Sequence, residues 1–156
     1  MADLKAGDPM PDSTLVGDDG KPTKIRDRLA GGKALVVYFY PKDETYGCTI
    51  EACGFRDQYQ TFSDAGAEVI GISKDDAGSH EKFKTHHRLP FTLMSDPGGK
   101  VADDWGVSAG FLGIAGRVTF VFDKQGKLAH RFGSAIRFGK HIDEALRVVK
   151  QLAARP

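Results

Sequence analysis

The sequence predicts a single α/β domain, residues 1–156, in which helices cover a mixed β-sheet. A continuously apolar, β-prone run at 34–40 and a second buried-strand candidate at 67–73 are each followed by a helical pattern, as in parallel strands joined by helices. Two further β-prone runs flank the polar turn 123–127, which is typical of an antiparallel hairpin. Because no linker divides the chain, both kinds of pairing are expected in one sheet.

The N-terminal segment is expected to hold turns and short strands. Residues 1–33 are rich in glycine, proline and aspartate, and two strand candidates lie at 14–16 and 23–25. A DDG sequence at 18–20 supplies the turn between them. The run at 34–40 is apolar throughout, which is typical of a strand buried on both faces in the centre of a sheet.

The middle of the chain alternates between helices and strands. The expected order is a helix at 49–63, a strand at 67–73, a polar helix at 77–87, a strand at 91–94, a short helix at 101–105 and a glycine-rich loop at 108–116. Three histidines, His80, His86 and His87, fall on the polar helix. We expect them to face solvent rather than to bind a metal.

The C-terminal part is expected to form a hairpin and a helix. Strands at 118–122 and 128–132 flank the polar turn. The final helix, at 140–152, carries apolar residues at helical spacing, and we expect this stripe to face the core. The stripe consists of Ile142, Ala145, Leu146, Val149 and Leu152.

Composition and charge exclude several classes of partner. The chain carries 22 basic and 21 acidic residues, and it has no basic block that predicts a nucleic acid or a membrane surface. Its longest apolar run, 34–40, is far shorter than the roughly 20 residues of a membrane span. The first residues lack the apolar stretch of a signal peptide, so we expect a cytoplasmic protein.

The only two cysteines, Cys48 and Cys53, lie where the buried strand gives way to a helix. In the reducing cytoplasm such a pair is more often catalytic, redox-active or metal-binding than structural. The unpaired N–H groups of a first helical turn favour negative charge and therefore stabilise a thiolate at Cys48. Pro41 ends the strand, and Thr45 places a hydroxyl three residues before Cys48, although such a threonine is also a common cap or turn residue.

The helical phase puts the two thiols on different faces. Cys48 shares its face with apolar residues, whereas Cys53 shares its face with polar ones. Five residues on an ideal helix rotate by about 140° and rise by about 7.5 Å, which separates the two Cα atoms by about 8.6 Å. A disulfide requires less than about 7 Å, so the two sulfurs cannot bond while the helix is intact.

The residues alone leave four interpretations of this pair open. Both cysteines can be inert and buried, as free cysteines often are. A thioredoxin-type dithiol requires a C-x-x-C spacing, whereas this spacing is C-x-x-x-x-C. A metal site would need further ligands, and the five histidines show no ligand spacing. The fourth interpretation is a nucleophilic thiolate with a second cysteine that resolves its oxidised form.

The segment PKDETYGCTIEACGFRD, at 41–57, resembles the active-site segment of the peroxiredoxins, and most of all that of the peroxiredoxin Q group, also called bacterioferritin comigratory proteins. Four further segments resemble that group in the same order: GDPMPDSTL, VIGISKDD, LPFTLMSDPGGKVADDWGV and GRVTFVFDKQGK. The resemblance therefore covers nearly the whole chain. The pattern P-x-x-x-T-x-x-C is specific for peroxiredoxins, and the second cysteine points to the Q group. Tyr46 departs from the group, in which a proline is usual.

The resemblance implies a thioredoxin-like fold and the activity of a thioredoxin-dependent peroxiredoxin. It assigns Cys48 as the peroxidatic nucleophile, Cys53 as the resolving cysteine and Thr45 as the hydroxyl that orients the peroxide. It also assigns Arg117 to the site, where a guanidinium could reach Cys48 across the end of the sheet. Pro41 is expected to shield the thiolate.

The resemblance further implies an antioxidant cycle. Hydrogen peroxide or a small organic hydroperoxide is reduced, an intramolecular disulfide forms, and a thioredoxin-like dithiol restores both thiols. No metal, flavin or haem cofactor is implied, and no nucleic acid or membrane partner. A monomer is expected, because the resolving cysteine lies in the same chain.

Two other expectations come from the residues themselves. A non-enzymatic redox sensor, which would use the same cysteine pair to switch a partner surface, is the alternative to an enzyme. Glu51 stands three residues after Cys48, and we expect it to act as a helix cap.

Overall fold

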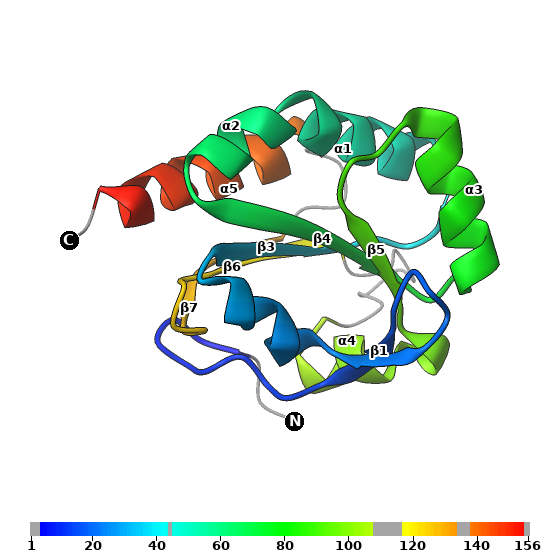
Figure 1. Ribbon diagram of the computed structural model, residues 1–156, viewed down its shortest axis with the longest axis horizontal. Helices are drawn as coiled ribbons and strands as arrows, with labels where there is room; N and C mark the ends of the chain where they lie inside the picture. Colours follow the sequence, from blue (N-terminus) through cyan, green and yellow to red (C-terminus); the bar gives the residue numbers. More distant parts are fainter. Residues whose placement is uncertain (1–3, 44, 108–116, 134–137, 155–156) are drawn as a thin grey trace.

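The computed structural model describes residues 4–43, 45–107, 117–133 and 138–154. Within these residues, seven strands form one mixed sheet of order β2-β1-β5-β4-β3-β6-β7. Figure 1 shows helices on both faces of this sheet, so the predicted α/β architecture is confirmed. The strands are β1 (Thr14–Val16), β2 (Pro22–Lys24), β3 (Ala34–Phe39), β4 (Ala67–Ser73), β5 (Thr92–Ser95), β6 (Val118–Phe122) and β7 (Leu128–Gly133).

Strand β3 lies at the centre of the molecule. It pairs in parallel with β4 and antiparallel with β6, and all of its residues are buried. Successive side chains alternate between the two halves of the core: Val36 and Tyr38 belong to one half, Leu35 and Val37 to the other. This burial on both faces is the physical reason for the continuous apolar run that predicts the strand.

The helices divide between the two faces of the sheet. They are α1 (Tyr46–Asp57), α2 (Tyr59–Asp64), α3 (Ala77–His87), α4 (Lys100–Asp104) and α5 (Phe138–Ala153), with 3₁₀ helices η1 (Ile25–Gly31) and η2 (Pro97–Gly99). In Figure 1, α1, α2 and α5 lie together above the sheet and α4 lies below it. The upper half of the core contains Phe55 and Val149, and the lower half contains Trp105 and Ile25. Among the residues described, no helix combines the length and the apolar character that a membrane crossing requires.

Several element boundaries differ from the sequence prediction. The helix expected at 49–63 begins at Tyr46 and divides at Gln58, whose φ of −101° and ψ of 6° lie outside helical geometry. The sequence pattern does not predict η1, because Ile25 is its only buried residue and one residue gives no periodicity. The loop expected at 108–116 lies outside the described residues.

The register of the sheet determines which residues before β6 lie beside the first turn of α1. Phe39 at the end of β3 pairs with Val118 at the start of β6. The chain leaves β3 at this edge and enters α1 seven positions later, while Arg117 stands directly before β6. The antiparallel pairing therefore brings Arg117 to the same end of the sheet as the first turn of α1.

Candidate active site

Helix α1 presents Cys48 as the third residue of its first turn. Thr45 is the N-cap residue, with an extended backbone (φ −78°, ψ 157°), and its carbonyl accepts the first helical hydrogen bond, from Thr49, at 2.8 Å. The backbone N–H groups of this turn have no partner within the helix and attract negative charge toward Cys48. The predicted location of Cys48 at a helix N-terminus is thus observed.

Cys48 is buried, with 1% of its surface exposed, and its sulfur accepts a hydrogen bond from Arg117. The distance from Nη2 of Arg117 to Sγ of Cys48 is 3.3 Å. Arg117 is itself buried, so little water screens this interaction. The structure therefore brings together two of the residues that the sequence associates with the site, although they stand 69 positions apart.

The same guanidinium also binds Glu51, a residue whose role the sequence analysis misses. Nη1 of Arg117 donates to Oε1 of Glu51 at 3.1 Å, and Glu51 is fully buried. The expectation that Glu51 caps the helix is wrong, because α1 begins at Tyr46 and Glu51 lies beyond its first turn. Helical spacing could have predicted the burial of Glu51. It follows Cys48 by three residues and precedes Phe55 by four, so it falls on the buried face of α1.

Burial raises the pKa of Glu51 to about 8, although the charge and hydrogen bond of Arg117 act in the opposite direction. At neutral pH Glu51 is therefore largely uncharged, and it leaves the positive charge of Arg117 available to the sulfur of Cys48. The second oxygen, Oε2, lies 3.5 Å from Nδ1 of His141, and the hydroxyl of Thr119 lies 2.7 Å from the same nitrogen. Helix α5 thus contacts the carboxyl group that holds Arg117 through His141, and β6 contacts the same imidazole through Thr119.

Cys53 lies in the same uninterrupted helix and is partly exposed, and both thiols are free. The helical spacing separates their Cα atoms by about 8.6 Å, beyond the reach of a disulfide. A bond between the two sulfurs therefore requires α1 to unwind locally.

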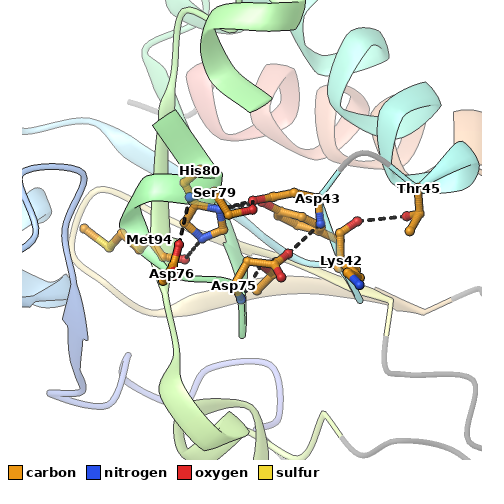
Figure 2. A network of polar contacts seen from close by, with 10 residues as sticks. Lys42, Asp43, Thr45, Asp75, Asp76, Ser79, His80 and Met94 are labelled. Atoms are coloured by element: carbon orange, nitrogen blue, oxygen red, sulfur yellow. Dashed lines mark hydrogen bonds and ion pairs between the residues drawn. The ribbon is translucent and has the colours of Figure 1, made fainter. Parts of the chain in front are cut away.

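Thr45 and Pro41 lie in the segment before Cys48, but the hydroxyl of Thr45 is bonded elsewhere. The hydroxyl of Thr45 donates to the carbonyl of Lys42 at 2.8 Å, as Figure 2 shows, and Thr45 is exposed. Pro41 is half-buried in the connection between β3 and α1. Tyr46, beside them, exposes 81% of its surface. The structure thus joins Arg117 to Cys48, but it directs the hydroxyl of Thr45 toward Lys42.

The histidines of α3 do not all behave as predicted. His86 is exposed and His87 is half-buried, but His80 is buried and bonded, so the expectation that it faces solvent is wrong. Its partner Asp43 lies 37 positions away, a pairing that helical periodicity does not reveal. Within the described part of the chain, no group of three or more His, Cys, Asp or Glu side chains could hold a metal ion.

Comparisons with known proteins agree with this geometry. The profile of the AhpC/TSA family matches residues 6–131. The chain is 48% identical over 150 residues to the chloroplastic peroxiredoxin Q of Oryza sativa subsp. japonica, covering 96% of this chain and 68% of that protein. It is 47% identical over 153 residues to the chloroplastic peroxiredoxin Q of Populus jackii, covering 97% and 71%.

Two solved structures show the same fold. The peroxidoxin BcpB of Mycobacterium tuberculosis superposes with a TM-score of 0.86 at 35% identity, covering 98% of this chain and 99% of that chain. The peroxiredoxin Q of Xanthomonas campestris superposes with a TM-score of 0.83 at 29% identity, covering 96% and 97%. The predicted thioredoxin-like fold is therefore confirmed.

Replacement of Arg117 tests its contact with Cys48. In a Cys53→Ser background, we expect Arg117→Ala to slow alkylation of Cys48 by iodoacetamide at pH 7 by about tenfold, because the thiolate loses a buried charged donor. Arg56→Ala is the matched control, since Arg56 lies on α1 but donates to the carbonyl of His87. Equal alkylation rates in the Arg117 variant and the control would contradict the contact.

The raised pKa of Glu51 predicts a pH dependence of stability. Between about 4.5 and 8 the folded state binds the Glu51 proton and the unfolded state releases it, so stability from this group is lost as pH rises through that window. Relative to Glu51→Gln, the wild-type free energy of unfolding should fall with rising pH, by at most about 1.4 kcal/mol per unit. Urea unfolding of both proteins at pH 5, 6, 7 and 8 with reductant measures this. Parallel pH profiles would refute the assignment.

Proposed function

The chain belongs to the AhpC/TSA family and, within it, to the peroxiredoxin Q group, and from this we propose which of its residues carry out each step of the reaction. The protein is a thiol peroxidase of the thioredoxin-dependent type, and its two cysteines are consistent with an intramolecular disulfide mechanism. One observation carries the assignment of roles: a buried thiol in the first turn of α1 accepts a hydrogen bond from a buried guanidinium.

We assign Cys48 as the nucleophile. Its thiolate attacks the terminal oxygen of a hydroperoxide, an S–O bond forms and the O–O bond breaks. The leaving oxygen takes up a proton and departs as water or an alcohol, so that the peroxide gains two electrons and Cys48 becomes a sulfenic acid. Arg117 and the first-turn N–H groups face the sulfur, where they stabilise the charge that moves onto the oxygens.

We assign Cys53 as the resolving residue. Its sulfur attacks the sulfenic acid, an S–S bond forms and the hydroxyl group leaves as water. Because the helical separation is too long for this bond, the first turns of α1 unwind before it forms. A dithiol reductant of the thioredoxin type then reduces the disulfide by two exchange steps and restores both thiols.

Thr45 and Pro41 receive roles from the family pattern P-x-x-x-T-x-x-C. We assign the hydroxyl of Thr45 to orienting the peroxide, which requires it to turn away from the carbonyl of Lys42 when substrate binds. Pro41 limits access of water to the thiolate. Hydrogen peroxide and small organic hydroperoxides are the proposed substrates.

The proposal also covers the number of domains, the oligomeric state, the compartment and the redox centre. We take residues 1–156 as one domain and the protein as a monomer, because one chain supplies both cysteines. A reducing compartment such as the cytoplasm suits a cycle that depends on a dithiol reductant. The cysteine pair is the redox centre, and the reaction as written uses neither a metal nor an organic cofactor.

Exchange of each cysteine separates their roles and distinguishes an enzyme from a sensor. With thioredoxin, its reductase and NADPH, the wild type should consume peroxide continuously, and Cys48→Ser should consume none. Cys53→Ser should react once per thiol and then stop, and its intact mass should show oxidation at Cys48. Continuous turnover by Cys48→Ser would reverse the assignment, whereas a wild type that reacts once and does not turn over would be a sensor.

Unwinding of α1 predicts a local loss of hydrogen-exchange protection on oxidation. Ala52 and Phe55 are fully buried, so opening this part of the helix costs a few kcal/mol in the reduced protein. In the disulfide form, amides of residues 49–55 should exchange at least about tenfold faster, while those of β3 keep their protection. Unchanged exchange in α1 of protein whose disulfide is verified by mass spectrometry would refute the unwinding.

A further inference from the structure

A second buried polar cluster lies beside the candidate active site and takes no part in the reaction described above. It joins α3 to the β3–α1 connection, which here means residues 40–43 and 45. Asp43 and His80 form its centre, and both are almost fully buried. Figure 2 shows their side chains in contact, with Ser79 beside them and Asp75 close to the backbone of Asp43.

Asp43 receives hydrogen bonds on both carboxylate oxygens. The hydroxyl of Tyr40 lies 2.5 Å from Oδ1, and Oδ2 accepts from Ser79 at 2.8 Å and contacts Nδ1 of His80 at 2.7 Å. Burial alone would raise the pKa of Asp43, but the hydrogen bonds from His80 and Tyr40 outweigh it and lower the pKa below its usual value. Asp43 is therefore a carboxylate that can only accept.

His80 faces an acceptor at each ring nitrogen. Nδ1 faces the carboxylate of Asp43, and Nε2 lies 3.0 Å from the carbonyl oxygen of Met94. A neutral imidazole has one donor and one acceptor, so it would leave a lone pair against one of these oxygens. The hydroxyl of Tyr40, which donates to Asp43, also lies 3.4 Å from Nδ1. Only the imidazolium donates at both ring nitrogens, and this geometry is the basis for the charged His80 inferred below.

The neighbouring charges are compatible with this cation. His80 is the fourth residue of α3, where the helix dipole disfavours positive charge, and Asp43 offsets that cost at contact distance. On the solvent side, His80 lines a hollow with Asp18, Glu81 and Lys84, of which Lys84 pairs with Asp18 at 3.6 Å.

The N-cap of α3 is also acidic. Asp76 accepts from the backbone N–H of Ser79, and Asp75 accepts from the backbone N–H of Asp43 at 2.6 Å. Three carboxyl groups thus surround the start of α3, where they favour a cation at His80.

We propose that Asp43 and a His80 imidazolium form a buried positioning pair, which fixes the β3–α1 connection on α3 and so sets the place where the first turn of α1 begins. Asp43 precedes Cys48 by only five residues, and the connection is then held by β3 at its start and by this ion pair at Asp43. The sulfur of Cys48 is thereby held against Arg117. The effect on catalysis rests on the proposed function, but the charge state of His80 does not.

The charge state is tested by nitrogen NMR of the reduced wild type at pH 7, with His80 assigned by comparison with His80→Gln. Both ring nitrogens of His80 should show the resonances of a protonated ring. A neutral tautomer at His80, with one protonated and one unprotonated nitrogen, would overturn the proposal without any reference to peroxidase activity.

The positioning role is tested by a double-mutant cycle in the Cys53→Ser background, with the rate of Cys48 oxidation by hydrogen peroxide as the readout. Asp43→Asn and His80→Gln should each slow this rate by roughly ten- to a hundredfold, since small displacements of a reacting group have effects of this size. The double variant should be no slower than either single one, because the two residues act as one pair.

The controls separate this role from general destabilisation. Lys82→Ala, on an exposed position of α3, should leave the rate unchanged, and Ser79→Ala, which removes one donor to Asp43, should slow it only a few-fold and serves if the stronger variants do not fold. Rates within twofold of the Cys53→Ser parent for all three cluster variants, or independent effects that multiply in the double variant, would overturn the positioning pair. A parent protein that does not react with peroxide would instead refute the proposed function.

Discussion

The buried guanidinium of Arg117 is the interaction on which the rest of the site depends. A charge taken out of water is costly unless it is paired and hydrogen-bonded, and Arg117 meets this condition with the sulfur of Cys48 and the carboxyl group of Glu51. Both partners lie on one face of α1, one turn apart. The guanidinium therefore ties the start of β6 to the helix that carries the thiol, and the pairing of β3 with β6 determines that the two meet.

The parts of the fold that repeat a simple pattern could be predicted from the sequence. Strand β3 is buried on both faces and is a continuous apolar run, β4 is buried along most of its length, and the last helix carries an apolar stripe. The start of α1 could not be placed, because Thr45 caps it through its backbone and not its side chain. The buried polar pairs could not be predicted for another reason. Partners such as Asp43 and His80 are distant in the chain, so neither their pairing nor their burial follows from local sequence patterns.

The proposed mechanism requires helix α1 to be ordered in one state and open in another, and its composition fits both demands. Gly47 and Gly54 stand on either side of the cysteine pair, and glycine is about 1 kcal/mol less favourable than alanine in a helix. Gly54 also allows close packing, because a Cβ at that position would lie 3.0 Å from Cδ1 of Ile142 on α5. The helix is therefore held by its contacts with the core and by Arg117 more than by its intrinsic propensity.

The full burial of Ala52 and Phe55 has a consequence for the lifetime of the protein in a cell. In the proposed mechanism α1 opens to form the disulfide; displacement of these side chains from the core would make apolar surface accessible to proteases and chaperones, which recognise exposed chain. The opened state persists for as long as the disulfide waits for its reductant. On this mechanism, cellular abundance of the protein would be coupled to the supply of reducing equivalents, because a shortage of reductant would lead to degradation of the enzyme as well as to its inactivity.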